Sequence, residues 1–113
     1  MAVRVGWVDG RLATSVVAIV LEDVVSGDTI EIQRTFPVHP RKTVRLGQNT
    51  YCLVRAGATH YRGVLSYALA GRLLTVTLTP DAADVLELPE VVEMKLGGDG
   101  AVVLAARLPA LLT

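Results

Sequence analysis

The chain has 113 residues, of which 51% are hydrophobic and 19% charged, and its basic and acidic side chains balance to a formal net charge of zero. This length fits one domain over residues 1–113. The apolar content excludes a disordered chain, and the zero charge excludes the broad positive surface of a general nucleic-acid binder. The strand patterns below predict an α+β fold, mostly β, with an antiparallel sheet, sandwich-like or strongly curved, and one or two short helices.

Membrane insertion and metal binding find little support in the residue pattern. The apolar run from Val16 to Leu21 is far shorter than the about 20 residues that span a bilayer, and Met1 to Arg11 is too interrupted for a signal peptide. Cys52 is the single cysteine, which rules out an intrachain disulfide and leaves no cysteine pair for zinc. We expect a cytoplasmic protein that needs no metal and no cofactor.

Two apolar runs open the chain. Val3 to Val8 is expected to pair with Ser15 to Leu21 through a turn at Asp9-Gly10. The second run is apolar and β-branched throughout, which is typical of a central strand covered on both sides.

A long polar connection separates the next two predicted strands. Asp28 to Phe36 alternates apolar and polar side chains after an entry turn at Ser26-Gly27, and Thr50 to Val54 is a further short strand. Residues 37–49 between them contain two prolines and several basic side chains. Connections of this length are more often functional than not.

A hairpin is predicted in the second half of the chain. Arg72 to Thr79 alternates leucine or valine with threonine, and Val64 to Leu69 alternates more loosely before a turn at Ala70-Gly71. Gly71 suits the positive φ of such a turn. Tyr67 alternates with two leucines, so we expect its side chain in the core.

A short helix is predicted after the hairpin. Thr79 is a capping residue, Pro80 suits the first helical position, and Asp81 and Asp84 complement the positive helix end. Pro89 restricts this helix to about two turns.

The C-terminal part begins with another alternating strand, Val91 to Leu96. Gly97 to Gly100 resembles a phosphate loop but lacks the lysine and hydroxyl residue that such loops use, so we interpret it as a turn. Ala101 to Arg107 fits either a helix or a strand, and Pro109 limits any helix there to a short one.

The charges are segregated along the chain. No acidic residue lies between Glu31 and Asp81, and the compensating acids lie in the flanking parts. One interpretation is that opposite charges meet across paired strands; a second is a basic face that recognises an acidic partner surface. A phosphate backbone is a third partner, but interleaved aromatic residues are missing. The basic residues of this stretch are Arg34, Arg41, Lys42, Arg45, Arg55, Arg62 and Arg72.

Four segments carry a resemblance to a known family. They are Ile32 to Arg34 (IQR), Gly47 to Val54 (GQNTYCLV), Thr59 to Val64 (THYRGV), and the strand and helix start from Leu73 to Ala83. The span from Ile32 to Ala83 that contains these segments is about half of the chain, and over it the sequence resembles the immunity protein 10 family. The first 27 residues lie outside the resemblance.

This resemblance implies a small bacterial protein, encoded beside a polymorphic toxin, that binds and neutralises the cognate toxin domain. Arg62 departs from the family pattern, which favours glycine at that position. The resemblance supplies no catalytic residues and does not identify the toxin.

An enzymatic interpretation of Cys52 and His60 as a thiolate and its base is weak, since Cys52 lies in an apolar run that favours a buried thiol. The acidic residues Asp81, Asp84 and Glu87 are expected to form a solvated helix face and not a calcium site. Tyrosine and arginine are frequent at interface hot spots, which favours Tyr61 and Arg62 as contact residues.

We therefore predict a non-enzymatic immunity protein that inhibits by occlusion, with a cognate toxin and neither nucleic acid nor membrane as its partner. The alternative is a structural or assembly module that forms a homo-oligomer, in the simplest case a homodimer, through strand edges or apolar patches. The predicted partner-binding residues are Arg41, Lys42, Arg45, His60, Tyr61 and Arg62.

Overall fold

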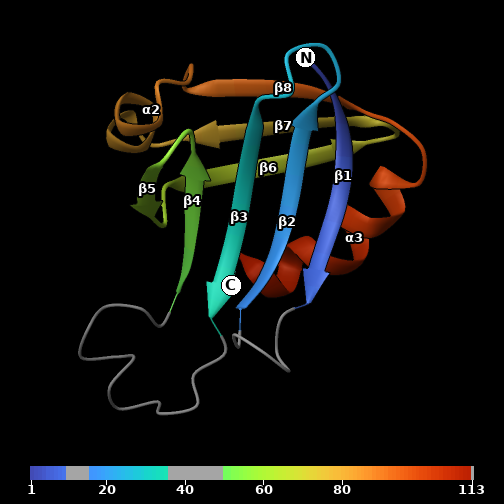
Figure 1. Ribbon diagram of the computed structural model, residues 1–113, viewed down its shortest axis with the longest axis horizontal. Helices are drawn as coiled ribbons and strands as arrows, with labels where there is room; N and C mark the ends of the chain where they lie inside the picture. The colour runs from blue at the N-terminus through green and yellow to red at the C-terminus, as the bar shows by residue number, and fades with distance from the viewer. Residues whose placement is uncertain (10–15, 36–49, 113) are drawn as a thin grey trace.

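The computed structural model describes residues 1–9, 16–35 and 50–112, which form one mixed sheet and two helices (Figure 1). Strands in this sheet follow the order β5-β4-β3-β2-β1-β8-β7-β6, and all neighbours are antiparallel except β1 and β8. The elements are β1 (Ala2–Asp9), β2 (Val16–Asp23), β3 (Thr29–Thr35), β4 (Tyr51–Arg55), β5 (Ala58–Tyr61), β6 (Val64–Ala70), β7 (Leu73–Leu78), α2 (Pro80–Leu86), β8 (Val91–Leu96) and α3 (Gly100–Leu111).

The sheet curls over on itself. In Figure 1 strands β1 to β5, which we call the front half-sheet, run across strands β6 to β8, the rear half-sheet. Helix α3 lies behind β1 to β3, and α2 lies beside the β4–β5 hairpin. The predicted α+β fold with a strongly curved, mostly antiparallel sheet is confirmed.

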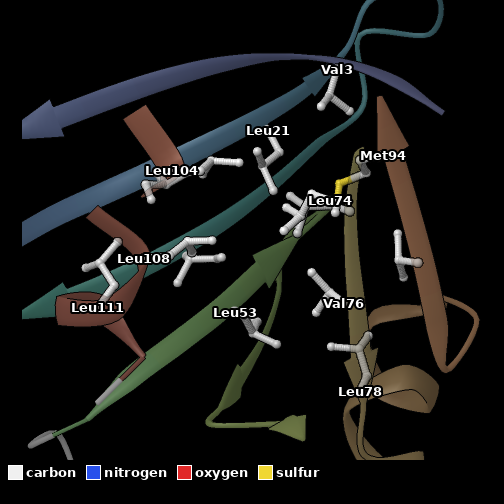
Figure 2. Close-up of a cluster of buried hydrophobic side chains, with 14 of the residues drawn as sticks. Val3, Leu21, Leu53, Leu74, Val76, Leu78, Met94, Leu104, Leu108 and Leu111 are labelled. Carbon is white, nitrogen blue, oxygen red and sulfur yellow. The ribbon is translucent and has the colours of Figure 1, made fainter. Parts of the chain in front are cut away.

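The core lies between the two half-sheets and α3. Figure 2 shows Leu104, Leu108 and Leu111 projecting from α3 on one side and Met94 from β8 on the other, with Leu21 between them. Each of these side chains is almost completely buried. At the margin of the core, the Arg107 guanidinium stacks 4.5 Å from the centre of the Trp7 ring.

Each strand of the front half-sheet turns alternate side chains into this core, and the remaining ones form what we call the outer face. The register places opposed residues of neighbouring strands on the same side. The outer face consists of Arg4, Gly6, Val8, Ala18, Val20, Glu22, Thr29, Glu31, Gln33, Cys52, Val54, Thr59 and Tyr61.

The predicted pairing of the first two strands and the central position of the second are confirmed, but the described elements pack over only one face of the second strand. β2 lies between β1 and β3, and its inward residues Val17, Ile19 and Leu21 are buried. Its other face belongs to the outer face, over which Figure 1 shows no helix or strand of the described chain. The apolar, β-branched sequence predicted two covered faces, and the described elements cover one.

The turns and strands after β2 largely follow prediction. The Asp23 carboxylate accepts hydrogen bonds from the Val25 and Ser26 backbone N–H groups, and Gly27 takes a φ of 77° in the predicted turn. Strand β5 was not predicted. It pairs with β4 through Ala56 and Gly57, whose φ angles of 49° and 83° suit a tight two-residue hairpin.

The hairpin of β6 and β7 is confirmed, with Gly71 at a φ of 58° in its turn, but the predicted core position of Tyr67 is wrong. The register shifts between Val64 and Ser66, which marks a β-bulge, and β6 forms an edge of the sheet. Tyr67 therefore remains 37% exposed and Leu65 64% exposed, because an edge strand has a neighbour on one side only.

Local chemistry explains the start of α2, whereas tertiary packing explains the extent of α3. The Thr79 hydroxyl accepts a hydrogen bond from the Ala82 N–H at 3.1 Å, with Pro80 in the first turn, as predicted. The C-terminal segment, whose sequence fits either a helix or a strand, forms the helix α3. The expectation that Pro109 keeps this helix short is wrong, since the helix continues to Leu111. Burial of Leu104, Leu108 and Leu111 on one side stabilises it across the proline.

Candidate partner-binding site

The predicted partner-binding residues fall into two groups. Arg41, Lys42 and Arg45 lie outside the described residues. His60, Tyr61 and Arg62 lie at the end of β5 and in the turn that leads to β6.

The strand register separates His60 from Tyr61. His60 pairs with the buried Leu53, on the inner side of the sheet, whereas Tyr61 pairs with Cys52 on the outer face. Tyr61 is 46% exposed. A nitrogen of the His60 ring, Nδ1, lies 3.3 Å from the Arg62 carbonyl oxygen, so His60 supports the turn and Tyr61 faces solvent.

The turn after β5 has a strained backbone. Arg62 takes a φ of 61°, a left-handed conformation that costs a side-chain-bearing residue about 1–2 kcal/mol. Gly63 follows at 110°, where a Cβ would lie 2.6 Å from the Ala82 Cβ. Glycine is thus required at 63 and favoured at 62, which gives a physical reason for the glycine in the family pattern.

Tyr51 fixes this turn from beneath. It is 6% exposed, its backbone oxygen accepts a hydrogen bond from the Arg62 N–H, and its hydroxyl accepts one from the Val64 N–H, each at 3.0 Å. The turn therefore presents the exposed Arg62 side chain from a fixed backbone. Sequence analysis missed the role of Tyr51, because only the tertiary fold brings its hydroxyl to the β6 backbone.

Two of the basic residues in the acid-free stretch have structural roles. Arg55 forms an ion pair with Asp28 at 2.9 Å and donates a hydrogen bond to the Leu86 carbonyl oxygen at the end of α2. Arg34 donates to the Leu111 carbonyl oxygen near the end of α3. At Arg55, therefore, the positive charge is compensated by an acidic residue from the flanking part of the chain, Asp28.

Cys52 and His60 do not form a catalytic pair, because the register puts their side chains on opposite faces of β4 and β5. The expectation that Cys52 is buried is also wrong: its side chain is partly exposed on the outer face, with Sγ 4.0 Å from Gln33 Oε1. Partial burial, together with the nearby Glu31 carboxylate, raises the pKa of the thiol above its ordinary value.

No other ligand site is visible in the described part of the chain. Asp81, Asp84 and Glu87 are exposed, and no group of three histidine, cysteine or acidic side chains in residues 1–9, 16–35 and 50–112 is arranged to hold a metal ion. An apolar cavity of about 20 Å³ beside Leu53 has room for at most one water. No described helix has the length and hydropathy to cross a membrane.

Comparison with known proteins identifies the family but no individual relative. No curated protein and no solved structure matches the chain significantly. The immunity protein 10 family matches residues 4–103, which extends the resemblance through β1 and β2 and into α3. The chain therefore belongs to the immunity protein 10 family.

Proposed function

We propose that this protein binds the toxin encoded by the adjacent gene and neutralises it by occlusion. The observation that carries the proposal is the family match over residues 4–103, which spans nearly every described element. The family's designation as immunity proteins supports a non-enzymatic role. A single cysteine, which cannot form an intrachain disulfide, fits action in the cytoplasm.

We assign part of the contact surface to the end of β5 and the turn after it. Tyr61 is exposed on the outer face, and Arg62 projects from a turn held by Tyr51 and Gly63. A fixed backbone lowers the entropy lost on binding. In this proposal, Arg41, Lys42 and Arg45 also bind the toxin, and their positive charge, with that of Arg62, steers association with an acidic toxin surface.

Association kinetics with the purified toxin of the adjacent gene test this assignment. Arg62→Glu is expected to slow association by roughly tenfold and to weaken its dependence on salt, because the steering charge is reversed. Arg72→Glu, at an equally exposed arginine in the β6–β7 turn, is the matched control and leaves the rate within about twofold. Equal effects of the two variants would exclude the basic turn, and no binding by the unmodified chain would refute the immunity function.

One observation favours a homo-oligomeric module as the second candidate function. β6 ends the sheet order, contains no charged residue, and exposes Leu65 and Tyr67. Edge strands are usually protected by charges, prolines or covering elements. Light scattering on the isolated chain tests this candidate, which requires a dimer that Leu65→Lys dissociates; a monomer excludes it.

A further inference from the structure

The outer face of the front half-sheet mixes polar and apolar side chains, and no described helix or strand packs over it. In β2 the outward Ala18 and Val20 belong to the run whose composition predicts burial on both sides. Ala18 is 5% exposed, whereas Val8, which pairs with it, is 51% exposed. Figure 1 looks onto these strands and shows no described helix or strand across them.

A carboxylate lies in the middle of this face. The register places Glu31 directly between Val20 of β2 and Val54 of β4. Its Oε2 accepts a hydrogen bond from Gln33 Nε2 at 3.3 Å. Nearby Glu22 pairs with Arg4, and Asp28 pairs with Arg55, but no described cation lies within ion-pair distance of Glu31.

A shallow hollow lies beside this carboxylate. Gly6 has no side chain, and it lines a hollow of about 160 Å³ together with Arg4, Val20 and Glu22. Val20 belongs to both the hollow and the surroundings of Glu31. The face thus has two valines on either side of a carboxylate, a depression, and a negative charge that no described cation pairs with.

We propose that the outer face binds the toxin through a lysine or arginine of the toxin that pairs with Glu31, while apolar toxin side chains cover Val20 and Val54. This inference rests on the proposed function and identifies a surface for it. Apolar residues around the ion pair exclude water, which is the arrangement in which a charged pair contributes most to an interface. Tyr61 lies at the β5 edge of the same face, so this surface adjoins the Arg62 turn.

The negative charge of Glu31 favours a basic toxin residue over two other partners, a second copy of this chain and a nucleic acid. A second copy stacked about a two-fold axis at Glu31 would bring two carboxylates together, because a symmetric interface opposes identical patches. Like charges in such positions oppose association. A nucleic-acid backbone would place phosphates against the same carboxylate. A single lysine or arginine on the toxin is the group that the charge of Glu31 attracts, next to the acidic toxin surface that the Arg62 turn attracts.

Charge reversal at Glu31 tests the proposal against a matched control. Glu31→Arg is expected to weaken the complex with the adjacent-gene toxin at least about 100-fold, and Glu31→Gln, which keeps the size of the side chain, roughly tenfold. Glu93→Arg reverses an exposed charge on β8 in the rear half-sheet and should change affinity by less than about threefold. Melting temperatures of all variants report whether they are folded.

Cys52 provides an independent footprint, because it is the only cysteine and its side chain lies on the outer face. Binding of the toxin should slow alkylation of Cys52 by at least about tenfold, measured by mass spectrometry on the Cys52 peptide. Equal affinities of Glu31→Arg and Glu93→Arg, or unchanged alkylation in the complex, would overturn the outer-face proposal and leave the immunity function intact. Failure of the unmodified chain to bind the toxin would remove both proposals. A dimer of the free chain that Glu31→Arg dissociates would assign the face to a second copy.

Discussion

The inner and outer faces of the front half-sheet are made by the same strands but follow different physical rules. On the inner face, Ile19, Leu21 and Leu53 are buried against the rear half-sheet and α3. On the outer face, Val20 and Val54 surround Glu31, and no described element packs over them. Burial between the half-sheets and α3 explains the apolar composition of the inner face, whereas no described element packs over the apolar residues of the outer face.

This difference teaches that stability and recognition can be separated within one strand. Side chains on the inner face stabilise the fold by leaving water when the chain folds. On the outer face, Val20 and Val54 remain partly exposed, and no described element packs over them, so a partner that covers them would remove further apolar surface from water. Substitutions at neighbouring positions of β2 should therefore change different properties.

The largest expected effect comes from a pair of adjacent truncations. Ile19 is completely buried, and Ile19→Ala should lower the free energy of unfolding by about 2–5 kcal/mol because it leaves a cavity. Val20→Ala, one residue further along, should cost less than about 1 kcal/mol, because its side chain is only partly buried.

Chemical denaturation and toxin affinity together measure this contrast. Val20→Ala should weaken the toxin complex, whereas folded Ile19→Ala protein should retain its affinity. Similar losses of stability at both positions, without any loss of affinity at Val20, would contradict the division between the two faces.

How far the sequence predicts the molecule depends on which face a residue occupies. Alternation correctly predicted the buried positions of β7 and β8, because one side of each strand meets the core. Alternation failed in β6, since a bulge changes the register at Leu65 without any local signal in the sequence. The structure of Ala101 to Arg107 was undecided because its composition fits a helix or a strand, and the burial of three leucines from one side of α3 is visible only in the fold.

The candidate site was predictable only in part, for similar reasons. Tyr61 and Arg62 were identified by residue type, and both are exposed. Glu31 was not, because a glutamate in an alternating strand looks like an ordinary solvated position. Its distinct setting depends on Val20 and Val54, which come from strands that are close only after folding. Arg41, Lys42 and Arg45 lie outside the described residues.

A second prediction concerns an inner-face residue that supports the predicted contact turn. The Tyr51 hydroxyl accepts the Val64 N–H at 3.0 Å, and Tyr51→Phe leaves this part-buried donor without that partner. We expect a loss of about 1–3 kcal/mol in the free energy of unfolding, measured by urea denaturation. Affinity for the toxin should fall as well, because the turn that carries Arg62 loses one of its fixed points; a stability loss with unchanged affinity would assign Tyr51 to the fold alone.

The smallest expected effect tests the geometry of the outer face without any partner. Partial burial and the Glu31 carboxylate both raise the pKa of Cys52, with burial the larger cause. Because the pKa is raised, a smaller fraction of Cys52 is the reactive thiolate at any pH below that pKa. Alkylation of Cys52 should therefore be slower than alkylation of a cysteine in the unfolded chain.

Glu31→Gln removes the negative charge and keeps the shape of the side chain. The pKa of Cys52 should then decrease toward its ordinary value, and alkylation at mildly alkaline pH should become faster by roughly twofold to threefold, since burial remains. Glu93→Gln, on the rear half-sheet, should leave the rate unchanged. The rate is measured against pH on folded protein, so that the midpoint and the plateau are separated. A lower midpoint with an unchanged plateau would place the Glu31 carboxylate beside the thiol on the outer face, and a changed plateau alone would mean that the substitution altered access to Cys52.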